Sequence, residues 1–200
     1  MIRPFQLFDL SGMYRVCLLT GDSGVDATEQ YRDPDLLGHI YAAPYAIADP
    51  ELTFVAADEQ GVLGYVVATA DTRAFERWLD ERWWPGLRQR YPLVDDPGDG
   101  TLDWQRIRHL HQARPVEEAL YAAYPAHLHI DLLPRGQGAG LGRKLMETLF
   151  DALRARGVRG LHLGVGSANP GARAFYLRMG FTEHRRDPWG STMVIGLEDV

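Results

Sequence analysis

Hydrophobic and polar positions alternate at two spacings along the chain, and their order predicts which segments form helices and which form strands. Within residues 10–20 the apolar positions are three or four residues apart, which predicts an amphipathic helix after a short strand at 2–5. The residues expected on its apolar face are Met13, Val16, Cys17 and Thr20. A short helix is expected around 34–43, and β-rich runs at 52–57 and 62–69 flank a short turn, which predicts a hairpin.

Residues 73–92 and 101–124 predict two further helices, which an irregular loop at 93–102 separates. Beyond them the pattern alternates between the two spacings. The expected elements are a strand at 126–133, a helix at about 139–156, a strand at 160–165, a helix near 170–179 and a strand at 191–197. Gly157 and Gly180 are expected to end the two helices of this block.

This order of elements predicts an α+β (mixed α/β) fold around a central sheet, with a helical insertion at about 72–125. The length of 200 residues predicts a single domain over 1–200. A net charge of −6 without a basic stripe argues against a nucleic-acid partner. No run of about 18 apolar residues occurs, so we expect no membrane span, no export and a cytoplasmic location. Cys17 is the only cysteine and lies among apolar neighbours, which predicts a buried structural thiol.

A glycine-rich loop, PRGQGAGLG at 134–142, connects the strand at 126–133 to the helix that follows. Main-chain N–H groups in such a loop, together with the dipole of the next helix, converge on an anion. The loop lacks the Lys-Ser/Thr pair of a Walker A motif, and Leu141 stands where a dinucleotide-binding motif counted from Gly136 needs its third glycine. An anion site and a tight connection without a ligand both remain open at this point.

Two linked motifs lie in the second half of the chain. The first is Arg135-x-x-Gly138-x-Gly140, and the second is NPGARAFYLRMGF at 169–181. Together they resemble the motifs of the GCN5-related N-acetyltransferase (GNAT) family. The residues of the second motif in register with the family are Asn169, Ala172, Phe175, Tyr176, Gly180 and Phe181. The resemblance implies a twisted, mostly antiparallel sheet flanked by helices, acetyl-CoA as cosubstrate and no metal.

A narrower resemblance is carried by three other segments. TGDSGVDATEQYRDPDLLGHIYAAPY at 20–45, RWWPGLRQRYP at 82–92 and HLHIDLLP at 127–134 are similar to bacterial acetyltransferases related to the acetyltransferase-like C-terminal domain of animal O-GlcNAcase. The animal domain looks like a pseudo-enzyme without the intact coenzyme loop. The loop is complete in this chain, which favours coenzyme binding.

The family resemblance assigns expected roles to single residues. Ile130 and Leu132 flank the point where the family's fourth strand bonds the pantetheine arm and splays from its neighbour. Asn169 bonds the pantetheine or only caps the next helix, and Tyr176 is the general acid for the coenzyme A thiolate or only a core aromatic. The residues expected around the pyrophosphate are Arg135, Gly136, Gln137, Gly138, Ala139, Gly140, Leu141 and Gly142. A surface salt bridge is the alternative for Arg135.

The general base is expected on the strand at 126–133, where His127, His129 and Asp131 share one face beside the expected thioester. We take His129 and Asp131 as candidate catalytic residues, together with Tyr176. A purely structural cluster is one alternative, and the H-x-H-x-D pattern also suits a metal ion, although the family's chemistry needs none. Four aspartates lie close together in the sequence, and they are Asp22, Asp26, Asp33 and Asp35. They either form an acidic entrance that attracts a cationic amine or belong to a solvated loop.

The sequence therefore predicts an acetyl-CoA-dependent N-acetyltransferase. Its partners are acetyl-CoA and an amine acceptor, which is a small molecule or a protein side chain, and the amine attacks the thioester directly. A non-catalytic acyl-CoA sensor or protein-interaction domain is the alternative from another class, and a nucleotide-binding protein is a third. The acceptor, the acyl selectivity and the choice between monomer and homodimer stay open.

Overall fold

A seven-stranded sheet organises the computed structural model, which describes residues 1–112 and 115–198. The strands are β1 (Ile2–Pro4), β2 (Thr53–Asp58), β3 (Gly61–Thr69), β4 (Ala126–Leu132), β5 (Gly160–Gly166), β6 (Thr182–Asp187) and β7 (Gly190–Gly196). Their spatial order is β1-β2-β3-β4-β5-β7-β6, and each neighbouring pair is antiparallel except β4 and β5, which are parallel. The expected mixed α/β fold with a mostly antiparallel sheet is confirmed.

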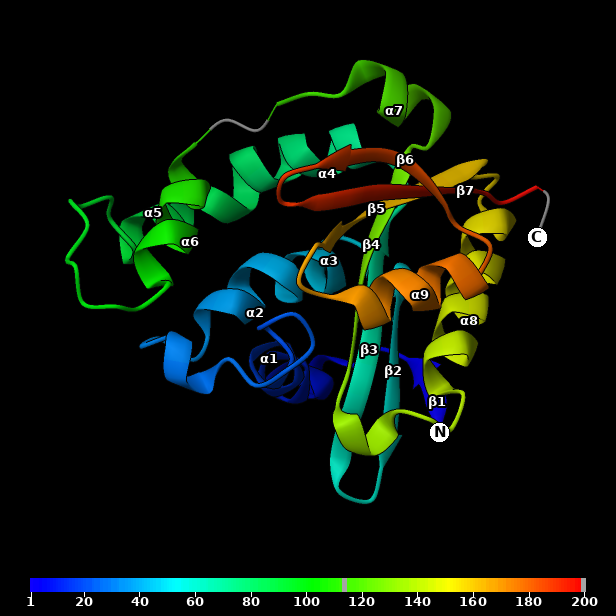
Figure 1. Cartoon of the computed structure of the whole chain (residues 1–200), viewed down its shortest axis with the longest axis horizontal. Coiled ribbons are helices and arrows are strands. Elements are labelled where there is room, and N and C mark those ends of the chain that lie inside the picture. Colours follow the sequence, from blue (N-terminus) through cyan, green and yellow to red (C-terminus); the bar gives the residue numbers. More distant parts are fainter. Residues whose placement is uncertain (113–114, 199–200) are drawn as a thin grey trace.

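Helices cover both faces of this sheet (Figure 1). They are α1 (Leu10–Leu19), α2 (Leu36–Tyr41), α3 (Ala43–Ala48), α4 (Thr72–Trp78), α5 (Trp84–Arg90), α6 (Asp103–His111), α7 (Glu118–Ala123), α8 (Leu141–Ala155) and α9 (Pro170–Arg178). In Figure 1, α1 and α2 lie on one side of the long strands β2 and β3, and α8 lies on the other side. The helices α4, α5 and α6 lie beside α2 and α3, whereas α7 lies at the top of the view, above β6.

Two apolar clusters hold these layers together, because side chains of a strand alternate between the faces. Tyr65 and Val67 of β3 belong to the cluster under α1, α2 and α3, whereas Val66 and Ala68 belong to the cluster under α8. The α8 residues at helical spacing in the second cluster are fully buried. They are Leu145, Met146, Leu149 and Leu153. Replacing one such buried leucine by alanine typically costs about 2–5 kcal/mol of unfolding free energy.

Most expected elements are confirmed, with shifts at their ends. The expected hairpin is β2–β3, and the expected buried face of α1 is buried. Gly157 and Gly180 follow α8 and α9 with φ of 71° and 94°. The helix α8 begins later than expected because Gly138 and Gly140 adopt φ of 79° and 75°, which no helical turn contains.

Two expected helices were wrong, and two elements were missed. Residues 101–124 form two helices, α6 and α7, and not one. Residues 73–92 form α4, a π-helical segment at Leu79–Trp83, and α5, so the helix is not uniform. The strand β6 and the helix α3 were not expected. The sequence of β6, TEHRRD, has no alternating apolar face because β6 lies at the sheet edge and pairs only with β7.

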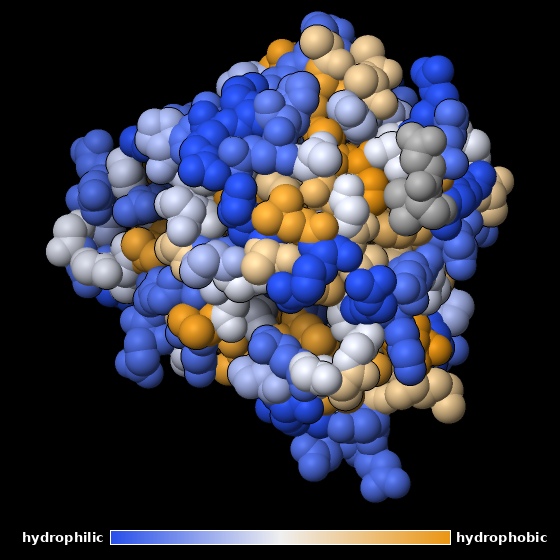
Figure 2. All heavy atoms as spheres, turned by 45° about the vertical axis from the view of Figure 1, so that its right-hand side comes forward, coloured by the Kyte–Doolittle hydropathy of each residue, from blue (hydrophilic) through white to orange (hydrophobic). Residues whose placement is uncertain are grey.

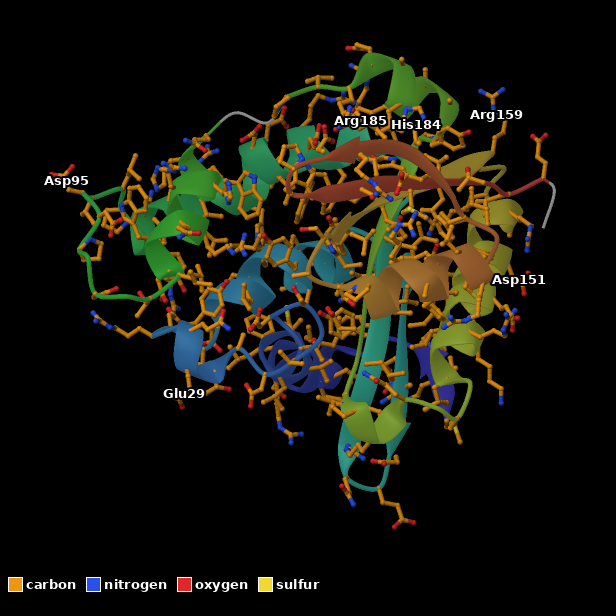
Figure 3. All side chains as sticks on the ribbon, viewed as in Figure 1. Glu29, Asp95, Asp151, Arg159, His184 and Arg185 are labelled. Atoms are coloured by element: carbon orange, nitrogen blue, oxygen red, sulfur yellow. The ribbon has the colours of Figure 1, made fainter. Side chains whose placement is uncertain are left out.

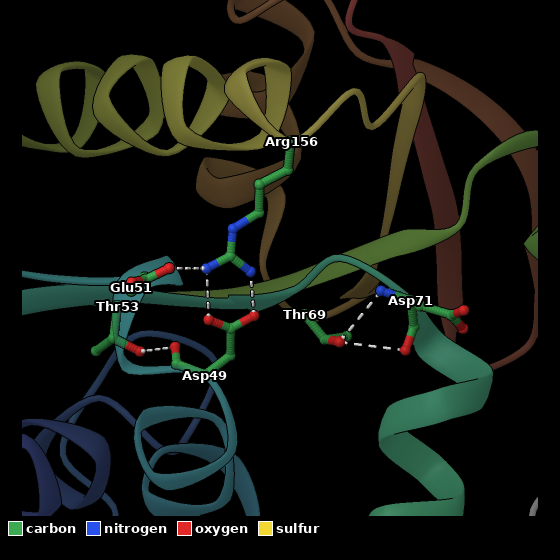
Figure 4. Close-up of polar contacts among 6 residues, drawn as sticks. All are labelled: Asp49, Glu51, Thr53, Thr69, Asp71 and Arg156. Carbon is green, nitrogen blue, oxygen red and sulfur yellow. Dashed lines mark hydrogen bonds and ion pairs between the residues drawn. The ribbon is translucent and has the colours of Figure 1, made fainter.

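The C-terminal end of α8 is fastened to the turn before β2 by Arg156 (Figure 4). Its guanidinium contacts both carboxylate oxygens of Asp49, at 2.5 and 2.9 Å, and Glu51 at 2.7 Å. This bidentate pair joins positions 107 residues apart in the sequence. It fixes the end of α8 that lies away from the glycine-rich loop.

On the face shown in Figure 2, apolar areas lie among hydrophilic residues. In Figure 3, Glu29, Asp95, Asp151 and Arg159 point outward from the ribbon, and His184 lies on β6 at the upper edge. Among the described residues, no helix combines the length and the apolar character that a membrane crossing requires.

Candidate cosubstrate and acceptor site

An opening between β4 and β5 defines the candidate site. These strands pair only at Ala126 with Leu161 and at His127 with His162. Beyond that point β4 continues to Leu132 paired with β3, and β5 continues paired with β7, so the two strands diverge. A cavity of about 860 Å³ fills the opening, and Ile130 and Leu132 both line it. The structure therefore places these two residues at a splay, as the family resemblance implies.

The glycine-rich loop forms one end of this cavity, where Gly138, Gly140 and Gly142 line it. A β-carbon at Gly138 or Gly140 would meet nothing within 4 Å, so their positive φ, and not crowding, favours glycine. A β-carbon at Gly142 would lie 3.5 Å from the Phe175 ring, which is an ordinary contact. At Gly136 it would lie 3.0 Å from the Leu132 side chain, so Gly136 serves packing beside the cavity.

The helix α8 begins at this loop without a side-chain cap. Gly140 is its N-cap residue and offers no side-chain acceptor to the first-turn N–H groups. Gln137 also lines the cavity, and its amide donates to the Leu132 carbonyl at 3.0 Å. Ala139 is exposed, and Leu141 lines the cavity. Uncapped N–H groups and a helix dipole directed at a cavity form a suitable cradle for phosphate oxygens.

The arginines that line the cavity near the glycine-rich loop are not the one expected from the sequence. Arg135 forms an ion pair with Asp58, at the end of β2, and does not line the cavity. Of its two expected roles, the geometry favours the surface salt bridge over a phosphate contact. Arg143 and Arg178 line the cavity instead. Sequence reasoning missed both, although Arg143 lies in the first turn of α8, directly after the glycines.

Asn169 and Tyr176 of the second motif both reach the cavity and also hold α9 in place. The Asn169 side chain accepts a hydrogen bond from the Ala172 N–H at 2.9 Å, which caps α9. The Tyr176 ring packs against Phe175 and Phe181, with centroids 5.5 Å away in each case. Burial raises the pKa of Tyr176, so its hydroxyl keeps the proton that a general acid donates. Asn169 thus caps α9 and Tyr176 packs in the core, whether or not they also contact a ligand.

Asp131 lies in the wall of the same cavity and is already hydrogen bonded. Its carboxylate accepts from the Tyr65 hydroxyl at 2.5 Å. Burial raises the pKa of Asp131, and the hydrogen bond from Tyr65 opposes the rise. The Thr20 hydroxyl donates its proton to the Val16 carbonyl at 2.8 Å. The Asp131 carboxylate therefore holds the Tyr65 hydroxyl, beside any catalytic role.

The two histidines of the same strand face meet at one tyrosine, which sequence reasoning missed. The Tyr45 hydroxyl lies 2.7 Å from His127 Nε2 and 3.1 Å from His129 Nε2. On the other side of the His127 ring, the Thr72 hydroxyl lies 2.7 Å from Nδ1 and donates to the Pro125 carbonyl, also at 2.7 Å. Tyr45 comes from α3 and Thr72 from α4, so only the folded chain brings them to β4.

The hydrogen bonds in this cluster have one consistent direction. A carbonyl only accepts, so the Thr72 proton goes to Pro125 and His127 Nδ1–H donates to Thr72. For a neutral His127 ring, Nε2 then accepts from Tyr45, and the Tyr45 oxygen accepts from His129 Nε2–H. In the neutral His129 ring these bonds place the proton on Nε2.

A second cavity of about 780 Å³ lies on the other side of this cluster. Four histidines line it, and they are His109, His127, His129 and His162. His162 Nδ1 donates to the Tyr124 carbonyl at 2.7 Å, and burial lowers the pKa of His162. The residues that line both cavities are Tyr41, Leu128, His129 and Gly164. His129 therefore lies where the two cavities meet.

The acidic segment and the metal alternative gain no support from the geometry. Asp22, Asp26 and Asp33 accept hydrogen bonds from side chains near them, and neither cavity is lined by them or by Asp35. Within residues 1–112 and 115–198, no group of three or more histidine, cysteine or acidic side chains is arranged to hold a metal ion.

Comparisons with known proteins agree with this geometry. The crystal structure of SsHAT is 41% identical, with 98% of each chain covered and a TM-score of 0.89. Rat protein O-GlcNAcase is 25% identical over 183 residues, which are 91% of this chain but 20% of the relative. The chain thus spans about a fifth of that relative's length. Mycothiol acetyltransferase of Beutenbergia cavernae is 36% identical over 132 residues, covering 64% of this chain and 37% of the relative.

More distant structures share the fold alone. The structure of yncA from Salmonella typhimurium, which contains acetyl-CoA, is 18% identical to this chain with a TM-score of 0.56. The match covers 100% of this chain and 95% of the other.

The model of the acetyltransferase (GNAT) family matches residues 21–181. Together with the splayed parallel strands and the glycine-rich loop, this match shows that the chain belongs to the acetyltransferase (GNAT) family.

Proposed function

We propose that this chain transfers the acetyl group of acetyl-CoA to the amine of an acceptor. One observation carries the proposal: a single cavity extends from the loop of Gly138 and Gly140 to His129, along the splay of β4 and β5. A phosphate cradle at one end and a titratable ring at the other match a cosubstrate that is charged at one end and reactive at the other.

The chain's own groups suit each part of acetyl-CoA. The N–H groups at residues 137–142 face the pyrophosphate, with Arg143 and Arg178 as charge partners. The edge of β4 that faces β5 has no strand pairing in the described structure after His127, so its main-chain groups are suited to bond the pantetheine amides. Ile130 and Leu132 lie on this part of the strand.

The chemistry then needs a base and an acid on either side of the thioester. His129 receives the proton of the acceptor ammonium, and the free amine forms a C–N bond to the carbonyl carbon. The C–S bond breaks as the intermediate collapses, and Tyr176 donates its proton to the departing thiolate. The second proton that the nitrogen loses on becoming an amide restores the Tyr176 hydroxyl. We assign the base to His129 and not to Asp131, because only His129 lines both cavities.

Calorimetric binding and thiol release together test this function. We expect wild-type protein to bind acetyl-CoA, to lose that binding in Gly138→Val/Gly140→Val, and to release free coenzyme A with at least one amine of a broad panel. His129→Gln should lower kcat by about 10²–10⁴-fold while acetyl-CoA binding persists. His184→Gln is the matched control, since His184 lies on the edge strand β6 outside both cavities. Binding without turnover on any amine would instead favour the sensor.

A further inference from the structure

Arg106 of α6 is a half-buried cation in the wall of the first cavity. Its Nε donates to the Tyr31 hydroxyl at 3.0 Å, and its Nη1 approaches the Tyr41 hydroxyl at 3.4 Å. Within the described part of the chain, its hydrogen bonds and ion pairs include no carboxylate. Half-buried guanidinium groups normally have an anionic partner, so this arginine is suited to an anion from outside the chain.

The position of Arg106 decides which molecule supplies that anion. Its guanidinium carbon lies 6.0 Å from the centroid of the Tyr41 ring, and the same ring meets His129 edge-on with centroids 5.3 Å apart. Tyr41 and His129 line both cavities, whereas Gly138 and Gly140 line only the first. Arg106 thus lines the first cavity one aromatic ring away from the proposed base, and that ring, Tyr41, lies where the cavities meet.

The cosubstrate does not supply an anion at this place. Its charges lie on phosphates, which the glycine-rich loop receives, and its thioester end is neutral. The acceptor amine is the other molecule that must reach His129. The charge beside His129 is thus positive, whereas one alternative from the sequence was an acidic acceptor entrance. No aspartate of residues 22–35 lines either cavity.

We propose that Arg106 binds a carboxylate or phosphate group of the acceptor, so that the acceptor is an amine that also carries an anion. This inference rests on the proposed acetyl transfer. A guanidinium fork binds either group through two parallel N–H···O bonds and would hold the amine beside His129. Arg106 then determines specificity without touching the thioester.

The test compares acceptors that differ only in the anion. One arm uses free amino acids and their carboxamides, and the other uses ethanolamine phosphate and ethanolamine. We expect wild-type protein to have a lower KM for the anionic member in one arm, which identifies the anion. Arg106→Gln should raise that KM by about tenfold to hundredfold. Its KM for the neutral member, its acetyl-CoA affinity and its melting temperature should stay unchanged, and Arg106→Lys should keep part of the preference.

Arg108→Gln is the matched control in the same helix. The Arg108 guanidinium lies 4.9 Å from the Trp104 ring centroid, and Arg108 is exposed and lines neither cavity. Acetylation with equal KM for both members of every pair would overturn the role of Arg106 and leave the proposed function standing.

A measurement without turnover separates the two proposals. Acetate and inorganic phosphate are titrated into protein saturated with coenzyme A, and we expect one of them to bind wild-type protein and not Arg106→Gln. If neither anion binds wild-type protein more tightly than the variant, the anion site is wrong. If an anion binds but no amine is acetylated, the anion site stands and the proposed acetyl transfer fails.

Discussion

The glycines of the loop at 134–142 are not equivalent at the residue scale. Gly138 and Gly140 have positive φ and open space around the missing side chain, whereas Gly142 lies in the first turn of α8 with ordinary helical geometry. Two of these glycines therefore shape the backbone, and Gly142 only lacks a side chain.

We expect Gly140→Ala and Gly142→Ala to change stability in opposite directions. Alanine at 140 must adopt a left-handed conformation, which costs about 1 kcal/mol, while alanine at 142 replaces a helical glycine and gains about 0.5–1 kcal/mol. Urea unfolding without ligand measures both changes. Equal destabilisation by the two variants would show that backbone conformation is not what distinguishes them.

Tyr45→Phe tests the hydrogen-bonded cluster behind His129. Loss of the hydroxyl removes the partner of both His129 Nε2 and His127 Nε2, so the orientation of the proposed base is no longer fixed. We expect kcat to fall by about tenfold to hundredfold at unchanged acetyl-CoA affinity. Tyr14→Phe is the matched control, because the Tyr14 hydroxyl also bonds a histidine, His39 at 2.6 Å, and Tyr14 lines neither cavity.

The sequence predicts part of the site at this scale and misses the rest for a physical reason. The loop glycines, Asn169 and Tyr176 stand at fixed spacings, because one loop and one helix turn must present them together. Tyr45 and Arg106 have no such spacing to His129. Tyr45 reaches His129 from α3, and Arg106 comes near it from α6 by way of Tyr41, through tertiary contacts that no local pattern encodes.

At the scale of elements, the divergence of β4 and β5 is what makes room for a ligand. Alternating residues predict β4 and β5 as strands, but pairing is a property of two segments, so the splay follows from the family resemblance and not from periodicity. The edge strand β6 was missed for a related reason. Its side chains are charged and exposed, and β7 and α9 hold it through Glu183.

Glu183 links β6 to its neighbours in a pH-dependent way. Hydrogen bonds from Arg186, from Ser191 and from Arg173 lower the pKa of Glu183 to about 2, against a weaker opposing effect of burial. Because the pKa in the folded state lies below its ordinary value of 4.5, the stabilisation is present above that value and is lost as pH falls toward about 2.

We therefore expect Glu183→Gln to increase hydrogen exchange in β6 at about pH 6, and to increase it less at about pH 3, where part of the wild-type stabilisation is already lost. Glu147→Gln is the control, since Glu147 makes a longer contact with Arg143 within α8. A difference between variant and wild type that grows toward low pH would contradict this account.

At the scale of the whole molecule, the two cavities belong to different parts of the chain. The first is built mainly from residues of 17–25, β4, the loop at 134–142 and α9, and the second mainly from α2 to α4 with residues of 109–112 and 115–121. The predicted insertion at 72–125 thus supplies much of the proposed acceptor side. The predictions of a single domain over 1–200 and of a cytoplasmic location stay predictions.

Acetyl-CoA should stabilise the whole fold, because it bridges elements from both halves of the chain. At a concentration of about 100 Kd, a ligand specific for the folded state contributes about 2.7 kcal/mol. For a protein of this size we expect the melting temperature to rise by about 5–10 °C, as calorimetry would show. Desulfo-coenzyme A should compete with it and ATP should not. Equal competition by ATP would revive the nucleotide-binding alternative.

The cosubstrate cavity also contains Cys17, and its setting bears on side reactions. Burial raises the pKa of the Cys17 thiol, and the nearby Asp131 charge raises it further. A thioester exchanges with thiolates and scarcely with neutral thiols. Cys17 should therefore not take the acetyl group from bound acetyl-CoA when no acceptor is present. Intact mass after incubation with acetyl-CoA should stay constant, and thiol reagents should report released coenzyme A with little background from the folded protein.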